Sequence, residues 1–201
     1  MQIIPTVLEK DFVRAEARVK LVKDYSQWIQ IDVTDNVYTE GKSFELELVG
    51  KIDFNTDDVL WDIHLMVKEP IDWINKCAFI AANRIIGQVE MMQDREKFIK
   101  TIKDGGWEAG LAFNTESAID NIPEETEMVV LMGRKAGFEI REFDESVFEK
   151  IKTLQKIQSK REKKFLIAVD GGVSMKNINA LKEAGVDVVY SGKSYLELIN
   201  A

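Results

Sequence analysis

Cysteine, histidine and proline are all scarce in this sequence, with one Cys, one His and three Pro among 201 residues. Because Cys77 stands alone, the chain has no internal disulfide and no zinc module of four cysteines. His64 also stands alone, which excludes a metal site with two imidazoles from one chain. No apolar run approaches the roughly 20 residues needed to span a bilayer, so we expect no membrane interaction.

The amino-terminal segment lacks the features of a secretory signal. Residues 1–12, MQIIPTVLEKDF, have neither a basic start nor a long apolar stretch. The simplest expectation is therefore a cytoplasmic protein.

Positive charge is in deficit, because the formal net charge is -8 at pH 7. An acidic surface repels the phosphate backbone of nucleic acids, so we expect no nucleic-acid partner. A local basic patch can still bind a single phosphate group.

Short apolar segments alternate with amphipathic segments along the whole chain, and we interpret the apolar ones as strands. Strands that alternate with helices indicate a parallel sheet covered on both faces. About eight such units in roughly 200 residues predict a (β/α)8 TIM barrel. A doubly wound open sheet is the alternative, but its G-x-G-x-x-G dinucleotide fingerprint is absent. We expect one α/β domain over residues 1–201, with strands at 3–4, 28–33, 60–67, 84–89, 108–113, 128–132, 165–169 and 186–190.

Two segments fit this pattern less simply. Pro5 follows the first apolar pair, and we expect it to end the first strand. The apolar residues between 43 and 52 fit both the alternation of a strand and the period of a short helix. We favour the helix, because the flanking parallel strands require a crossover.

Carboxylates end two of the predicted strands, at Asp32 and Asp170. In a TIM barrel these strand ends line the active site. A carboxylate there is costly to bury unless it is paired or used. Two of them on separate strands can remove a proton from one face of a carbon and return one to the other face. The alternative is that they cap helices or pair with lysines.

Two further features near strand ends have a structural and a functional interpretation. His64 lies within an apolar strand, where a lone histidine is more often a hydrogen-bonded structural residue than a ligand. Gly171 and Gly172 precede a predicted helix, and exposed N–H groups at such a turn can bind a phosphate. The alternative for the glycine pair is an ordinary strand-to-helix turn.

Several segments together resemble the ribulose-phosphate 3-epimerase family. Residues 3–12, IIPTVLEKDF, resemble I-x-P-S-I-L-x-x-D-F, and residues 28–36, WIQIDVTDN, resemble W-I-H-V-D-V-M-D-G. Residues 61–70, WDIHLMVKEP, are similar to L-D-V-H-L-M-V-x-x-P. Residues 169–173, VDGGV, match the strand-seven motif, and residues 190–194, YSGKS, resemble the closing A-G-S-A. The order and spacing hold across nearly the whole chain.

The resemblance implies a TIM barrel of the ribulose-phosphate-binding type and an isomerase that inverts a pentulose 5-phosphate at C3. It implies that Asp32 and Asp170 transfer protons through an enediolate. It also implies a divalent metal, namely zinc, iron or manganese, held by Asp32, His64, Asp170 and the residue at position 30. The expected substrate-binding residues are Thr6, Met66, Met132, Gly171, Gly172, Ser191, Gly192 and Lys193.

One departure from the family pattern concerns the metal. Gln30 stands where the family has its second metal-binding histidine. A Gln carbonyl oxygen is a neutral, weaker ligand for zinc or iron than imidazole. We therefore predict metal binding that is weaker than in the family, or absent.

The other departure concerns the phosphate. Glu139 and Ile140 replace a glycine pair whose amides help to bind phosphate in the family. Lys193 follows a motif that otherwise matches, and we predict that its charge partly replaces those amides. Arg134 is the second candidate, and Arg141 lies in the same loop.

The leading functional hypothesis is a sugar-phosphate epimerase that uses the two aspartates. The second is a barrel that has lost catalysis and serves as a binding or assembly protein. The third is an epimerase or isomerase for a different sugar. The retained aspartate pair favours the first, and the lost histidine and glycines favour the second. We expect a sugar phosphate as the ligand and a homo-oligomer as the assembly.

Overall fold

The computed structural model describes residues 1–52, 59–138 and 142–201, and within these residues eight parallel strands close into a barrel. Each strand pairs with its neighbours in sequence, and β1 closes the ring by pairing with β8, with Ile3 opposite Val189. The predicted (β/α)8 barrel is therefore confirmed. The strands are β1 Gln2–Val7, β2 Trp28–Thr34, β3 Leu60–Met66, β4 Arg84–Gln88, β5 Glu108–Phe113, β6 Met128–Met132, β7 Leu166–Asp170 and β8 Val188–Ser191.

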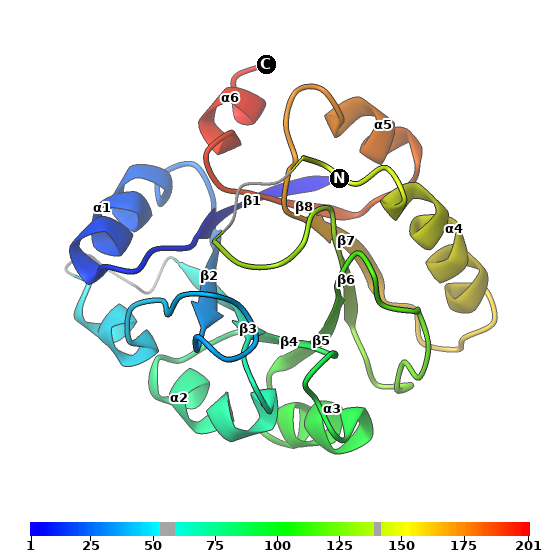
Figure 1. Ribbon diagram of the computed structural model, residues 1–201, viewed down its shortest axis with the longest axis horizontal. Helices are drawn as coiled ribbons and strands as arrows, with labels where there is room; N and C mark the ends of the chain where they lie inside the picture. Colours follow the sequence, from blue (N-terminus) through cyan, green and yellow to red (C-terminus); the bar gives the residue numbers. More distant parts are fainter. Residues whose placement is uncertain (53–58, 139–141) are drawn as a thin grey trace.

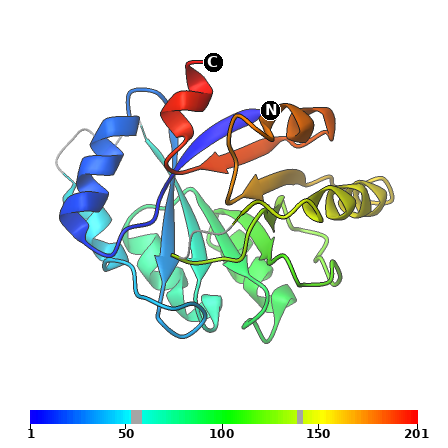
Figure 2. The same cartoon turned by 45° about the horizontal axis from the view of Figure 1, so that its top comes forward.

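Helices surround the strands on the outside of the barrel (Figure 1). The last helix, α6, packs against β1, so the two termini lie close together (Figure 2). No helix within the described ranges is long and apolar enough to cross a membrane. The helical elements are α1 Phe12–Val22, η1 Leu46–Lys51, η3 Pro70–Trp73, α2 Ile74–Phe79, α3 Arg95–Asp104, α4 Val147–Gln158, α5 Ile178–Glu183 and α6 Tyr195–Ile199.

Helix α1 illustrates how local sequence sets these elements. The Asp11 carboxylate accepts a hydrogen bond from the Arg14 N–H and so caps the first turn. Ala15, Val19 and Val22 recur at helical spacing and are fully buried against the barrel. The opposite face of α1 is polar or exposed, as the amphipathic pattern predicts.

Of two predictions about local structure, one is wrong and the other is confirmed. The prediction that Pro5 ends the first strand is wrong, because β1 continues to Val7 and Pro5 itself pairs with Ser191. The φ angle that proline fixes is compatible with extended backbone, so Pro5 removes one donor from the ladder without breaking it. The segment near residue 46 is helical as favoured, in the form of the 3-10 helix η1. The predictions about Glu139, Ile140 and Arg141 lie outside the described residues.

Alternation along the strands divides the buried residues into two layers. Alternate residues of β6, including Met128, Val130 and Met132, face the barrel interior. Their neighbours Val129 and Leu131 pack outward against the helices. The same alternation turns polar residues of other strands inward, and it brings the strand-end groups together at the C-terminal mouth of the barrel.

Candidate active site

Two buried carboxylates share one imidazole at the C-terminal mouth of the barrel. Asp32 of β2 and Asp170 of β7 are 5% and 6% exposed. His64 of β3, directly beside Asp32 in the sheet, is fully buried. Its Nδ1 lies 3.2 Å from Asp32 Oδ1 and 3.2 Å from Asp170 Oδ2. The structure thus brings together the three residues that the strand positions place at one mouth.

Burial and mutual repulsion set the protonation of this group. Burial, followed by the negative charge of Asp170, raises the pKa of Asp32 to about 6. Burial lowers the pKa of His64, but its contacts with the two carboxylates raise it more, to about 10. His64 is therefore an imidazolium at neutral pH, and its charge partly offsets the two carboxylates.

The second ring nitrogen of His64 fixes the orientation of the imidazole. Nε2 of His64 donates to the side-chain oxygen of Gln88 at 3.2 Å. The Gln88 amide nitrogen donates in turn to Glu90 Oε2 at 2.7 Å and to the Ala112 carbonyl at 3.1 Å. The Tyr38 hydroxyl also donates to Glu90 Oε2, at 2.9 Å. This chain of bonds holds the ring with Nδ1 facing the carboxylates.

Gln30 contacts both carboxylates of the same group, but its side-chain amide does not have the orientation expected of a metal ligand. Its Nε2 donates to Asp32 Oδ1 and to Asp170 Oδ2, both at 3.0 Å. Its Oε1 is buried and has no hydrogen-bond partner within the described parts of the chain. The amide would have to turn over to present Oε1 as a ligand on the side of the carboxylates.

The group fits a divalent cation. The ligand atoms of Asp32, His64 and Asp170 all lie within 4.8 Å of one another. Two carboxylates and one imidazole match the set of three protein ligands that leaves an open position at catalytic metal sites. His64 must lose its Nδ1 proton to bind the ion, so a cation and a proton compete for it.

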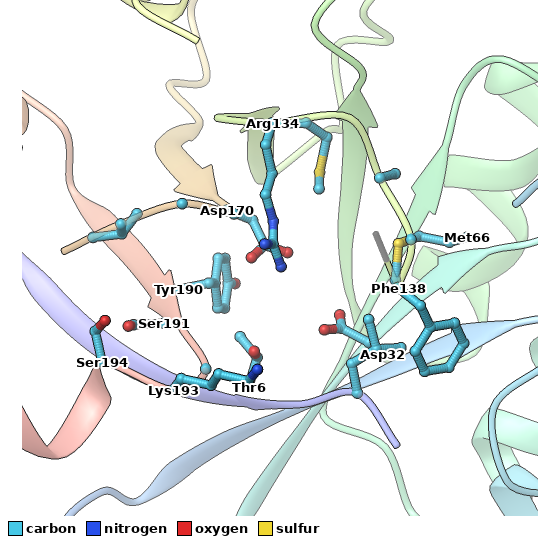
Figure 3. Close-up of a pocket in the computed structure, with 18 of the residues that line it drawn as sticks. Thr6, Asp32, Met66, Arg134, Phe138, Asp170, Tyr190, Ser191, Lys193 and Ser194 are labelled. Carbon is cyan, nitrogen blue, oxygen red and sulfur yellow. The ribbon is translucent and has the colours of Figure 1, made fainter. Parts of the chain in front are cut away.

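A pocket of about 490 Å³ opens above these carboxylates. Its volume lies within the usual range for small-molecule sites. Asp32 and Asp170 line its inner part, and Figure 3 shows both directed into it from different walls. The expected substrate-binding residues all line the same pocket, namely Thr6, Met66, Met132, Gly171, Gly172, Ser191, Gly192 and Lys193.

The glycine pair after β7 has a backbone that requires glycine. Gly171 and Gly172 have φ angles of +90° and +71°, in the left-handed region that other residues rarely adopt. On the adjacent strand β8, Ser191 is 3% exposed and its hydroxyl has no partner among the described residues. Glycine backbone and a free hydroxyl thus line the same side of the pocket.

Cations gather around this pocket although the protein is acidic. Figure 3 shows Arg134 and Lys193 reaching into it from opposite walls. The side chain of Lys193 is exposed and that of Arg134 is half-buried. Arg18 of α1 also lines the pocket and donates to the carbonyl of Gly192. The sequence reasoning missed Arg18, although it lies one turn from the buried Ala15 and Val22 and so faces the barrel.

Comparison with known proteins identifies the family of this chain. Residues 2–196 match the Ribulose-phosphate 3 epimerase family. The chain belongs to this family. The predicted family and enzyme class, an isomerase that acts as an epimerase, are confirmed.

Relatives in the ribulose-phosphate 3-epimerase family match over almost the full chain. A ribulose-phosphate 3-epimerase of Buchnera aphidicola subsp. Baizongia pistaciae is 31% identical, with 97% of this chain and 88% of that protein covered. The Bacillus subtilis enzyme of the same name is 29% identical, with 96% and 91% covered. The fold alone is shared with phosphoribosyl anthranilate isomerase from Thermus thermophilus, at a TM-score of 0.67 and 7% identity over 96% of this chain and 88% of that one.

Proposed function

We propose that residues 1–201 form a single catalytic domain that inverts a pentulose 5-phosphate at C3. The observation that carries the proposal is the pair of buried carboxylates, Asp32 and Asp170, which enter one pocket from different strands. Membership of the family supports the class of reaction. The pocket volume of about 490 Å³ suits a phosphorylated sugar of this size.

Proton transfer follows from the two carboxylates. One ionised carboxylate removes the proton from C3, and the electron pair of the C–H bond forms a double bond between C2 and C3. The negative charge then resides on the former carbonyl oxygen as an enediolate. The other carboxyl returns a proton to the opposite face of C3, which restores the ketone with inverted configuration. Burial, followed by the charge of Asp170, raises the pKa of Asp32 to about 6, so Asp32 can take up and release a proton near neutral pH.

A divalent cation, when bound by Asp32, His64 and Asp170, would supply Lewis-acid stabilisation of the developing oxyanion. Side chains of this chain also position the two carboxylates. The amide of Gln30 donates to both carboxylates and the imidazolium of His64 contacts both, so the two acids are held in a fixed relation.

The phosphate end of the substrate occupies the side of the pocket formed by β7 and β8. We assign the phosphate to the backbone amides of Gly171, Gly172 and Gly192, together with the ammonium group of Lys193. Thr6 and Ser191 supply hydroxyl groups on the same side. Met66 and Met132 lie over the reacting carbons and keep water from the enediolate.

The reaction is tested by proton exchange with solvent. Wild-type protein is incubated with ribulose 5-phosphate in deuterium oxide, and deuterium at C3 is measured by NMR. We expect incorporation at C3 together with formation of the epimer. Deuterium exchange with a hexulose phosphate but not with a pentulose phosphate would mean that the substrate is a different sugar. Absence of exchange with every pentulose and hexulose phosphate would contradict the proposal and favour a barrel without catalysis.

The assignment of Lys193 is tested by binding of inorganic phosphate. Titration at low salt compares wild type with Lys193→Ala, and we expect weaker binding by the variant because a charge-assisted bond is lost. Lys160→Ala removes one positive charge from an exposed position outside the pocket and serves as the control. Equal affinity of Lys193→Ala and wild type would remove Lys193 from the phosphate site.

A further inference from the structure

Arg134 is placed over the reacting end of the pocket by the path of the chain after β6. Met128, Val130 and Met132 of β6 all face the barrel interior. Arg134 follows two residues beyond Met132, after the end of β6, and lines the pocket. It therefore enters the site directly above the last interior residue of its strand.

Gly133 lets this part of the chain approach β7 closely. The Gly133 N–H donates to the carbonyl of Asp170 at 2.6 Å. A Cβ atom on residue 133 would lie only 2.4 Å from the carbonyl oxygen of Gly171, so a larger residue would push the two strand ends apart. The residue after Gly133 is thus held beside the catalytic strand end.

The side chain of Arg134 lies along the residue that follows Asp170. A Cβ atom on Gly171 would be 2.8 Å from Cγ of Arg134 and 3.4 Å from its Nε. Figure 3 shows the Arg134 side chain directed into the pocket, on the same side as Asp170. No carboxylate in the described part of the chain forms an ion pair with Arg134, although its side chain is half-buried. The guanidinium charge is therefore available to a ligand.

We propose that Arg134 is a catalytic residue that binds and stabilises the enediolate oxygens, an inference that rests on the epimerase function proposed above. The reacting carbon must lie between the carboxylates of Asp32 and Asp170 for protons to reach both of its faces. Arg134 packs against Gly171, which follows Asp170 at the mouth of the barrel, so its guanidinium group is on the mouth side of that carbon. Its fork of N–H groups and permanent charge suit two adjacent oxygens that become negative in the transition state.

Two other cations that line the pocket, Lys193 and Arg18, are less well placed for this role. Lys193 enters from the opposite wall beside Thr6, at the phosphate end (Figure 3). Arg18 donates to the carbonyl of Gly192, so its guanidinium is engaged with the turn after β8. Because Lys193 and Arg134 enter from different walls, we assign the phosphate to Lys193 and the enediolate oxygens to Arg134.

The test measures catalysis and anion binding on the same variants. Arg134→Gln keeps two N–H donors but loses the charge, and Arg134→Lys keeps the charge. We expect Arg134→Gln to lower kcat for C3 exchange by about 10²- to 10³-fold, the usual effect of removing one oxyanion-stabilising group. Arg134→Lys should retain a larger share of kcat. The affinity of both variants for inorganic phosphate should fall by less than that of Lys193→Ala.

The outcomes separate this inference from the function on which it rests. If wild type shows no exchange, the epimerase function itself fails. If wild type is active and Arg134→Gln binds phosphate more weakly with unchanged kcat, Arg134 is a phosphate ligand and the inference is overturned. Equal kcat and equal phosphate affinity in Arg134→Gln and wild type would also overturn it. Lys160→Ala, the exposed control, should match wild type in both measurements.

Discussion

The barrel holds two ionic clusters, each built around a buried carboxylate, that differ in how their charged groups are paired. The mouth cluster consists of Gln30, Asp32, His64 and Asp170. The floor cluster, at the other end of the strands, consists of Asp62, Arg84, Glu108 and Tyr190. Both bury carboxylates inside the same barrel, but only the mouth cluster opens into the pocket through its carboxylates.

The floor cluster pairs each charge with a strong partner. Arg84 bonds Asp62 Oδ2 at 2.9 Å and Glu108 Oε2 at 2.6 Å, and its guanidinium stacks on the Trp28 ring at 4.2 Å. The Tyr190 hydroxyl donates to Asp62 at 2.5 Å. Arg84 thus offers a different nitrogen to each of its two carboxylates, whereas in the mouth cluster both carboxylates contact the same nitrogen of His64 and the same nitrogen of Gln30. Asp62 Oδ1 has no hydrogen-bond partner among the described residues, so the clusters differ in how donors are shared and not in whether every oxygen is satisfied. Shared donors and access to the pocket suit the mouth carboxylates to proton transfer.

We expect the largest effect from substitutions in the mouth cluster. Asp32→Asn and Asp170→Asn keep the shape of each side chain but can neither take nor give the proton. Each should lower the rate of C3 deuterium exchange by about 10²- to 10⁴-fold, the usual contribution of one general acid or base. Exchange is measured by NMR, and circular dichroism checks that the fold is retained. Exchange at the wild-type rate in both variants would remove these residues from the mechanism.

The next effect breaks the floor cluster. Arg84→Met leaves the buried Asp62 carboxylate without its cation, and we expect a loss of about 3–5 kcal/mol in the free energy of unfolding. Denaturant unfolding measures this loss. The double variant Asp62→Asn with Arg84→Met removes both charges and should recover much of the stability. If Arg84→Met is as stable as wild type, the floor cluster has no structural role and the comparison fails.

The mouth cluster could be predicted from the sequence, and the floor cluster could not. Asp32, His64 and Asp170 were predicted to meet, because each lies near the end of an apolar strand and parallel strands end at the same rim. The floor cluster was not predicted. Asp62 and Arg84 lie inside strands, and they become partners only through the register that sets Asp62 opposite Arg84.

The sequence also does not predict how individual side chains are oriented. Position 30 was identified as a ligand position, but the contacts decide that Gln30 presents Nε2 rather than Oε1 to the carboxylates. Likewise, the sequence favoured Lys193 over Arg134 for binding phosphate. It contained no signal that Gly133 brings Arg134 over Gly171, because that approach depends on how closely two strand ends pack.

The third prediction concerns the metal affinity of the mouth cluster. Elemental analysis of protein purified without added metal should find less than one equivalent of zinc or iron, since Gln30 is a weak fourth ligand. Gln30→His adds a second imidazole and should raise the affinity for zinc by about 10- to 100-fold or more, by analogy with changes around metal ligands. Competition with a chelator measures this. Tightly bound stoichiometric metal in wild type would contradict the prediction.

The smallest effect concerns the pH dependence of that metal affinity. The two carboxylates outweigh burial and raise the pKa of His64 to about 10, so its proton is bound throughout the neutral range. A cation must displace this proton, and its apparent affinity should therefore rise by about tenfold per pH unit between pH 7 and 9. Zinc titrations at constant ionic strength measure the slope. A flat profile would mean that the cation binds without His64.

Tyr190 belongs to both ends of the barrel. Its ring forms part of the pocket wall, while its hydroxyl bonds Asp62 and contacts Met128 Sδ at 3.1 Å. Replacing it with a smaller residue would deepen the pocket toward longer substrates, but it would also take a donor from a fully buried carboxylate. Redesign of this barrel for a larger sugar is therefore coupled to its thermal stability, and enlarging the pocket at Tyr190 calls for a compensating change at Asp62.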